Sequence, residues 1–350
     1  MQRMLLIWLL LCWGAVSCTP EDKPAGSLRI AFETGALQTK AGDGVVADGG
    51  GIYVGENNVP DLVILIADSG GAIVATYPSS GRDGIKDGSV EGTPEATQMS
   101  VSFSGLPGNN AVYTVYAFAN TTGLWTMKSG DSVVSNLTAL TTAAQVEALQ
   151  FEPIAADLDT DGCLAVKNSR LPLSAKGTVT LQGSGNGEIS LAMLRCVAKV
   201  TAVFENQYGD DLTLLDFSNT FFHMRPETGY VVPHQSDFPV SWASADPLIA
   251  TEGSLSIASD DQYSKSWYVF PSMGPYTCTV SFTATISGNT NNYSYPDLPV
   301  HDDHARDIPH LARNQHLTIT TRISKGKQVS FNFEVADWIT EDKTESVYFD

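Results

Sequence analysis

The sequence predicts a mostly β protein made of two β-sandwich domains in tandem, with short helices in the loops. Short segments in which apolar and polar residues alternate recur between turns rich in Gly, Asn and Asp, which is typical of β-sandwiches. Long amphipathic runs of helical period are scarce. The 350 residues exceed one typical domain and suit two domains of about 150 residues each. We expect both sandwiches to have transthyretin-like or Greek-key topology.

The chain begins with an export signal that ends in a cysteine. Arg3 supplies a positive charge, the run from Met4 to Trp13 is apolar, and small residues lead to Cys18. An apolar run of this length is too short to cross a bilayer. A plain secretory signal needs no cysteine after the cut, so we expect residues 1–17 to be removed and the Cys18 thiol to be acylated. Acyl chains on Cys18 would hold the protein to the membrane. Ordinary secretion with an incidental cysteine is the alternative.

Residues 18–40 read as a polar tether followed by a first strand. In that strand Leu28, Ile30 and Phe32 alternate with polar or small residues, so all three would lie on the buried face of a sheet. The strand runs into a loop of small residues that contains Lys40. Such a loop exposes its peptide bonds to a trypsin-like protease, although an ordinary basic loop residue is the simpler interpretation from the local sequence alone.

The N-terminal sandwich is predicted over residues 41–187. Asp68-Ser69-Gly70-Gly71 joins two alternating segments as a tight hairpin turn. Pro78–Thr97 is polar and is predicted to be a long exposed loop, and Thr142–Leu149 is the best candidate for a short helix. Strands are expected at 61–67, 72–77, 99–103 and 112–119, the last apolar enough to be central in its sheet.

The C-terminal sandwich is predicted over residues 188–350, after a glycine-rich turn at 183–187. Its strands are expected at 189–205, 212–217, 267–270, 276–286, 317–323 and 329–335. A last alternating piece, Thr344–Asp350, carries Val347 and Phe349 at period two.

Charge and cysteine usage limit the partners and the covalent structure. The formal net charge of −19 argues against nucleic acid as a partner, because phosphate binding requires a basic surface. Of the five cysteines, Cys12 leaves with the signal and Cys18 would carry lipid. For Cys163, Cys196 and Cys278, one disulfide with one buried thiol and three buried free thiols both remain open.

No motif indicates catalysis or a cofactor, so we expect the protein not to be an enzyme and to need no cofactor. Asp68-Ser69-Gly70-Gly71 is similar to the nucleophile loop of chymotrypsin-like proteases, but all six histidines follow it, whereas that family places its histidine before. Asp157, Asp159 and Asp161 are spaced as in a calcium loop. Asn168 stands where the bidentate glutamate would be, so a solvated acidic turn is expected.

The segment from His301 to His316 holds the densest set of possible transition-metal ligands. It contains Asp302 and Asp303 together with His301, His304, His310 and His316. Zinc requires three or four ligands on rigid elements, whereas this segment contains prolines and is predicted to be a loop. We therefore expect no metal site here, and we place His316 on a strand.

Several motifs follow one another along the chain in a definite order. They are a lipobox ending at Cys18, an early strand, TKAGDG, DLVILIADSGG, VYTVYAFAN, LRCVAKVTAVF, LARNQHLTIT and VADW. Their order and spacing resemble the fimbrillin family, the pilins of the type V fimbriae of Bacteroidota. The resemblance covers nearly the whole chain from Cys18 to Asp350.

The resemblance implies a processing site at Lys40, because pilins of this family are cut after an Arg or Lys at the matching place. An Arg/Lys-specific protease would cut between Lys40 and Ala41 and so free the strand that contains Leu28, Ile30 and Phe32. Removal of that strand would leave an apolar groove with unpaired sheet edges, which recruit another strand.

The incoming strand would come from the C-terminal segment of a neighbouring subunit, with Val347 and Phe349 facing the groove. A head-to-tail joint that does not close on itself gives a filament. The resemblance therefore implies a fimbrial subunit that polymerises by donor-strand exchange into surface fimbriae for adhesion. Its partners would be other fimbrial subunits, self or homologous, the protease, host or bacterial surface ligands, and the outer membrane through the lipid.

Two other functions are consistent with the same features. A fimbrial anchor or accessory subunit would keep its lipid and would not be cut. A surface glycan-binding lipoprotein would also be an acidic protein of two sandwiches, and its only hint is four scattered tryptophans, Trp125, Trp242, Trp267 and Trp338. Core packing accounts for tryptophans more simply.

Overall fold

The structure is a computed structural model, and it describes about two thirds of the chain. The described residues are 25–33, 46–47, 61–91, 100–108, 110–121, 125–153, 171–183, 185–222, 225–226, 229–232, 242–243, 248–252, 254–302 and 304–337. Several residues singled out above lie outside these ranges, namely Cys18, Lys40, Ala41, Asp157, Asp159, Asp161, Cys163, Asp303, Trp338, Val347 and Phe349.

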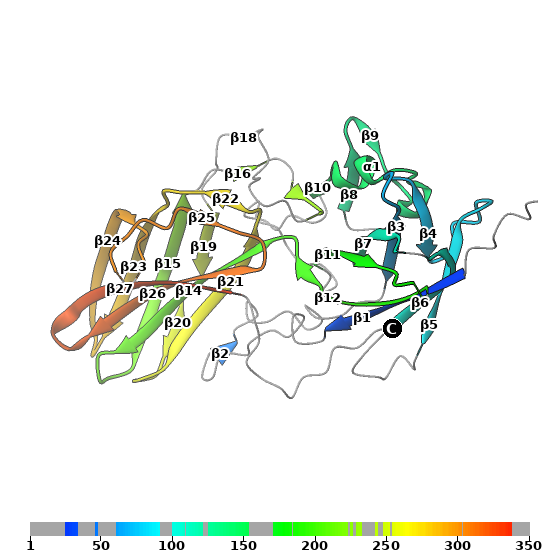
Figure 1. Ribbon diagram of the computed structural model, residues 1–350. Helices are drawn as coiled ribbons and strands as arrows, with labels where there is room; N and C mark the ends of the chain where they lie inside the picture. The colour runs from blue at the N-terminus through cyan, green and yellow to red at the C-terminus, as the bar shows by residue number, and fades with distance from the viewer. Residues whose placement is uncertain are drawn as a thin grey trace, which may run out of the picture.

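The N-terminal sandwich is built on a nine-stranded sheet with the strand order β12-β1-β6-β5-β4-β3-β7-β11-β13 (Figure 1). Its strands are β1 (Ala25–Glu33), β3 (Leu62–Ala67), β4 (Ile73–Tyr77), β5 (Lys86–Glu91), β6 (Ser100–Pro107), β7 (Val112–Ala119), β11 (Leu173–Thr180), β12 (Asn186–Ala192) and β13 (Leu194–Arg195). The sheet folds over one core, because apolar residues of β1 and β6 cluster with those of β3, β7 and β11.

A second layer covers the other face of β3 and β7. It is a four-stranded sheet in the order β17-β10-β8-β9, made of β8 (Trp125–Ser129), β9 (Ser132–Val133), β10 (Leu149–Pro153) and β17 (Gly229–Tyr230). The 3-10 helix η2 (Leu137–Ala139) and the helix α1 (Ala143–Glu147) connect β9 to β10. Thr142 and Gln145 form a capping box that fixes the start of α1. Within the described residues no helix is long and apolar enough to span a membrane.

The C-terminal sandwich packs two sheets face to face. One sheet has the order β2-β21-β14-β26-β27 and the other has β19-β15-β23-β24 with β20 on β15. Their strands are β2 (Val46–Ala47), β14 (Ala198–Gln207), β15 (Leu212–Phe222), β19 (Leu248–Glu252), β20 (Leu255–Ile257), β21 (Gln262–Val269), β23 (Thr277–Ile286), β24 (Asn289–Pro299), β26 (Gln315–Ser324) and β27 (Gln328–Asp337). Short pieces are β16 (Arg225–Pro226), β18 (Trp242–Ala243), β22 (Ser272–Met273), β25 (His310–Leu311) and the 3-10 helix η5 (Lys325–Lys327).

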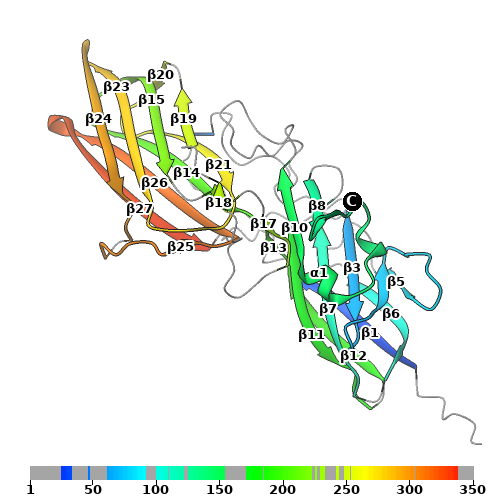
Figure 2. The same cartoon turned by 90° about the horizontal axis from the view of Figure 1, so that it is seen from above.

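The two sandwiches share a hydrophobic core where they meet. Tyr268 and Phe270, at the end of β21, belong to the same buried cluster as Phe118 of β7 and Phe151 of β10. The rings of Phe151 and Phe270 lie edge to face with centroids 5.2 Å apart. Both views show the two groups of strands as separate lobes (Figures 1 and 2), and Figure 2 shows that they meet near β10, β13 and β21. The shared core therefore ties the lobes together by side-chain packing as well as by the chain.

Most of the predicted elements are confirmed. The mostly β fold with sandwiches in tandem is present, β7 is an interior strand, and a helix lies within Thr142–Leu149. The hairpin turn at Asp68 is present as predicted, because Asp68 Oδ1 accepts hydrogen bonds from the backbone N–H groups of Gly70 and Ala72 at 2.9 Å.

Two predictions of local structure were wrong. Pro78–Thr97 is not wholly a loop, since it contains β5, whose polar sequence gave no alternation to reveal it. The single strand predicted over 189–205 is instead three strands, β12, β13 and β14. The apolar stretch around Cys196 is buried at the junction between the sandwiches, which explains why it resembled the continuation of a strand. The chain passes from the nine-stranded sheet to the C-terminal sandwich between Arg195 and Ala198. Strand β12 precedes this point and pairs within the N-terminal sandwich.

Candidate functional site: the groove filled by the first strand

Strand β1 lies between two strands that come from later parts of the N-terminal sandwich. It pairs in parallel with β12, with Ile30 opposite Ile189, and antiparallel with β6, with Ile30 opposite Val101. The blue strand is seen beside β12 and β6 (Figures 1 and 2). Among the described strands, β12 pairs with β1 alone. Strand β1 therefore connects β12 to the rest of the sheet.

The inner face of β1 completes the core of the N-terminal sandwich. Leu28 and Ile30 are fully buried and Phe32 is 2% exposed. They belong to one cluster with Ile64 and Val115 from the opposite half of the sheet. Because burying a large apolar side chain contributes about 1.5–3 kcal/mol, these three contribute roughly 5–9 kcal/mol to the folded state. The predicted burial of these three residues is confirmed.

The outer face of β1 makes polar contacts with both neighbouring strands. Arg29 Nη1 lies 2.6 Å from Glu188 Oε1 on β12, and Arg29 Nη2 donates to Ser100 Oγ on β6 at 3.2 Å. Ser27 Oγ donates to Asn186 Oδ1 at 2.7 Å. The charged pair is exposed to solvent and so contributes little stability, but Glu188 favours a cation at this position of the strand.

The start of β1 approaches the turn before β12 very closely. The backbone N–H of Ser27 donates to the carbonyl of Gly185 at 2.8 Å. A Cβ atom on Gly26 would lie 2.1 Å from Gly185 O and 2.9 Å from Leu181 Cδ1, so only glycine fits there. At Gly187, opposite Leu28, a Cβ atom would lie 2.5 Å from Leu181 Cδ2. The groove thus has room only for glycine at the position of Gly26, the second residue of β1.

Removal of β1 would leave two unpaired edges and an open core. The backbone groups of β6 and β12 that now pair with β1 would lose their partners, and three apolar pockets would face water. Unpaired edges of this kind are templates for an added strand. The groove can therefore hold an extended segment through backbone hydrogen bonds and alternate side chains. It does not supply the chemistry of a catalyst.

The structure brings together the three buried residues predicted for this site and adds others that the sequence did not indicate. Glu188, Ser100, Asn186 and Gly185 contact β1 from 71 to 159 residues away along the chain. No local pattern marks such partners. The one local signal for these partners is the glycine-rich turn at 183–187, which by its sequence indicates only a boundary between domains.

The histidine segment does not form a metal centre in the described part of the chain. No group of three or more His, Cys, Asp or Glu side chains comes together there. His301 Nδ1 pairs with Asp307 Oδ1 at 3.0 Å. Asp302 binds Arg306 through Nε at 2.8 Å, and these hydrogen bonds lower the pKa of Asp302 to about 2. His316 lies on β26, as predicted, with Nε2 2.7 Å from Thr201 Oγ1.

His316 gives the stability of the C-terminal sandwich a specific dependence on pH. Burial, followed by the charge of Lys199, lowers the pKa of His316 to about 3. Below about pH 6.5 the unfolded chain binds a proton that the folded protein excludes until about pH 3, so the free energy of unfolding should fall by up to about 1.4 kcal/mol per pH unit from this residue. Denaturant unfolding of wild type and His316→Gln between pH 7 and pH 4 should show a shallower loss in the variant. His304→Gln, at an exposed position, is the matched control; equal slopes in all three proteins would contradict the assignment.

The two described cysteines are buried thiols. Cys196 and Cys278 are both buried and free. Burial raises the pKa of both thiols, to about 12 for Cys278. No disulfide joins these two residues, and Cys163 lies outside the described residues.

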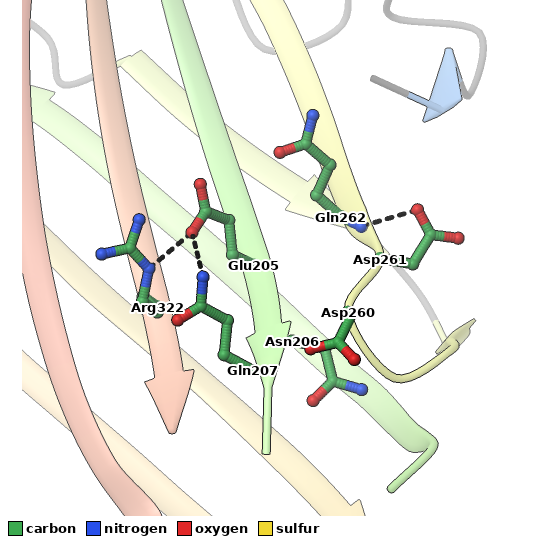
Figure 3. A pocket seen from close by; sticks show the side chains of 7 residues that line it. All are labelled: Glu205, Asn206, Gln207, Asp260, Asp261, Gln262 and Arg322. Atoms are coloured by element: carbon green, nitrogen blue, oxygen red, sulfur yellow. Dashed lines mark hydrogen bonds and ion pairs between the residues drawn. The ribbon is translucent and has the colours of Figure 1, made fainter. Parts of the chain in front are cut away.

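A second hollow lies at one end of the C-terminal sandwich (Figure 3). It is lined by Glu205, Asn206, Gln207, Asp260, Asp261, Gln262 and Arg322. Arg322 Nε lies 2.6 Å from Glu205 Oε2, and Asp261 Oδ1 accepts a hydrogen bond from its neighbour's backbone at 2.8 Å. These contacts join side chains of paired strands or sequence neighbours, and none of them spans the hollow. We therefore interpret the hollow as a polar surface at the end of the sheets. It lacks the apolar pockets of the β1 groove.

Comparison with solved structures finds proteins of similar fold. The fimbrillin FimA from Porphyromonas gingivalis is 11% identical with a TM-score of 0.50, covering 91% of this chain and 99% of that chain. The tip fimbrial protein Mfa3 from Porphyromonas gingivalis, with a C-terminal truncation, is 14% identical with a TM-score of 0.47, covering 90% and 100%. A fimbrial assembly protein from Parabacteroides distasonis is 11% identical with a TM-score of 0.43, covering 89% and 98%.

The chain belongs to the family described as fimbrillin-A associated anchor proteins Mfa1 and Mfa2, whose model matches residues 113–344. No curated protein sequence matches the chain. The predicted fimbrillin resemblance is confirmed, and the protein is a fimbrial subunit or accessory protein of the cell surface.

Proposed function

We propose that this protein is a structural fimbrial subunit that is exported as a lipoprotein, cut after Lys40 and polymerised by donor-strand exchange into adhesive fimbriae. Acylation of Cys18 carries the precursor through the periplasm to the outer membrane. Cleavage between Lys40 and Ala41 by an Arg/Lys-specific protease then separates β1 from the sandwich. The protein acts by binding other subunits and surface ligands and not by catalysis.

One observation carries the proposal. A single strand, β1, closes the core and joins two edges, and its chain continues from Glu33 toward Lys40 without another described element before β2. While the chain is intact, β1 stays at high effective concentration beside its groove, so another strand cannot compete. A cut at Lys40 removes this advantage, because β1 is then held only by its side chains and backbone hydrogen bonds.

The strand that enters the β1 groove is the C-terminal segment of a neighbouring subunit. This chain's own C-terminal segment is donated in turn, with Val347 and Phe349 in the groove of the next subunit. Apolar burial of about 1.5–3 kcal/mol per side chain, with a ladder of backbone hydrogen bonds, makes such a joint long-lived. The joint is not symmetric, so it extends into a filament.

A disulfide that locks β1 in place tests whether the strand must leave. Ser27 of β1 faces Ser104 of β6, and both side chains are exposed. Directly opposed residues of antiparallel strands have Cα atoms about 4.5–5.5 Å apart, which a disulfide can bridge. We expect Ser27→Cys with Ser104→Cys to be cut normally yet to be absent from fimbriae on the producing cells. Addition of a reductant should restore incorporation.

Ser27→Cys alone is the matched control and should assemble with or without reductant. Mass spectrometry of the isolated fimbriae shows which chains they contain and whether the lock is closed. Incorporation of the cut and locked subunit in normal amounts would contradict displacement of β1.

The description of the matched family favours one alternative, a fimbrial anchor. An anchor would keep Cys18, its lipid and β1, and would contact the fimbria through another surface. The two functions differ in the N-terminal residue of the mature protein.

A further inference from the structure

We propose that the β1 groove accepts the strand of a different protein, and that this chain's own C-terminal segment does not fit it. This inference rests on the proposed exchange of β1. It follows from the contacts that β1 makes in the groove, which define the side chains required of any strand that takes its place.

Five positions of β1 carry these requirements. The first must be glycine, because a Cβ atom on Gly26 would meet Gly185 O at 2.1 Å. The second, fourth and sixth positions after it must be apolar, because Leu28, Ile30 and Phe32 fill the buried pockets. The third position after the glycine favours a cation, because Arg29 pairs with Glu188 at 2.6 Å. The groove is thus specific for the pattern Gly, any, apolar, cation, apolar, any, apolar.

The chain's own segment, residues 338–350, does not contain this pattern. Its sequence, WITEDKTESVYFD, has no glycine and nowhere places three apolar residues at alternate positions. Only Val347 and Phe349 alternate, and Glu345 precedes them in the same series. If Phe349 fills the Phe32 pocket and Val347 the Ile30 pocket, Glu345 falls in the Leu28 pocket.

Two other placements of the segment also put Glu345 at a position that does not suit it. A shift by two residues brings Glu345 to the Gly26 position, beside the carbonyl of Gly185. A strand running in the opposite direction, with Phe349 in the Leu28 pocket and Val347 in the Ile30 pocket, places Glu345 in the Phe32 pocket. Burial of a carboxylate without a partner is strongly unfavourable. In each of these placements its free-energy cost exceeds the stabilisation that Val347 and Phe349 provide. The preferred occupant is therefore another subunit whose segment has the full pattern.

Peptide exchange into the full chain tests this specificity. A recognition sequence for a site-specific protease is inserted between Lys40 and Ala41, the protein is cut, and fluorescent peptides compete with β1, measured by anisotropy. The probes are residues 25–33, residues 340–350, and a rebuilt tail peptide 340–350 with Lys343→Gly, Glu345→Leu and Ser346→Arg. The control tail peptide has Lys343→Gly, Glu345→Arg and Ser346→Leu, so it has the same composition with the apolar and cationic positions exchanged.

We expect the 25–33 peptide and the rebuilt tail to bind at least about a hundredfold more tightly than the natural tail and the control tail. In protein with Glu188→Lys, the preference should shift by roughly twofold to fivefold toward a 25–33 peptide with Arg29→Glu, as suits an exposed pair. Equal binding of the natural tail and the 25–33 peptide would overturn the inference while leaving strand exchange intact. Failure of the 25–33 peptide itself to exchange would overturn the proposed function and this inference with it.

Discussion

Replacement of Lys40 by alanine should leave a folded subunit that no longer enters fimbriae. In the proposed mechanism β1 leaves only when its connection is cut, and its apolar face contributes roughly 5–9 kcal/mol while it remains attached. Fimbriae sheared from cells that produce Lys40→Ala should therefore lack this subunit, and the soluble or membrane fraction should contain the full-length chain. Size-exclusion chromatography and denaturant unfolding should show a monomer as stable as the uncut wild type.

Arg29 is the one basic residue of β1 that could offer a substitute cleavage site. Its backbone is paired with β6 and β12, and its side chain binds Glu188, so a protease has poor access to it. Lys86→Ala, at an exposed position of β5, is the matched control and should assemble normally. Normal fimbriae from a variant with both Lys40→Ala and Arg29→Ala would count decisively against the mechanism.

Deletion of Thr344–Asp350 should abolish donation while leaving folding and processing nearly intact. The described core of the C-terminal sandwich closes with β26 and β27, which pair along their whole length before the segment begins. We expect the truncated chain to be cut at Lys40 and to fold as a monomer. The heat- and detergent-resistant ladder of interlocked subunits that contain this chain should disappear on gels of sheared fimbriae.

A double substitution tests the apolar side chains of this segment without shortening the chain. Val347→Ser with Phe349→Ser removes the apolar side chains, and Glu345→Ser is the matched control that keeps them. The first variant should behave like the deletion and the second like wild type. If the truncated chain instead misfolds on its own, the segment belongs to its own sandwich and is not the donor.

The proposed specificity of the groove implies two different kinds of neighbour for the subunit. In the inference above, its groove requires glycine and three alternating apolar residues and favours a cation, whereas its own segment offers Val347 and Phe349 preceded by Glu345. The chain would therefore accept a strand from one kind of subunit and donate to another kind. This arrangement suits a minor component at a fixed place in a fimbria better than the repeating unit of a shaft.

The sequence predicted those parts of the fold that local chemistry determines. Alternation revealed β1 and the burial of Leu28, Ile30 and Phe32. The tetrapeptide Asp68-Ser69-Gly70-Gly71 indicated the turn, and Gln145 and Glu147 among alanines indicated the helix after Thr142. It could not predict β5, because that strand is held by backbone pairing to β4 and β6 and carries polar side chains.

The candidate site was predictable only in part, for the same reason. The apolar side of the groove follows from period two, but its polar side depends on contacts across long stretches of chain, such as Arg29 with Glu188. The close approach of Gly26 to Gly185 depends on how β12 returns beside β1, and single-sequence patterns do not specify that register.

The N-terminal residue of the protein in fimbriae taken from the cell surface tests the central claim most directly. N-terminal sequencing or mass spectrometry of the sheared fimbriae should find Ala41 as the first residue, with residues 18–40 absent. A polymerised subunit that begins at an acylated Cys18 and retains β1 would contradict cleavage-triggered exchange and would instead support an anchor.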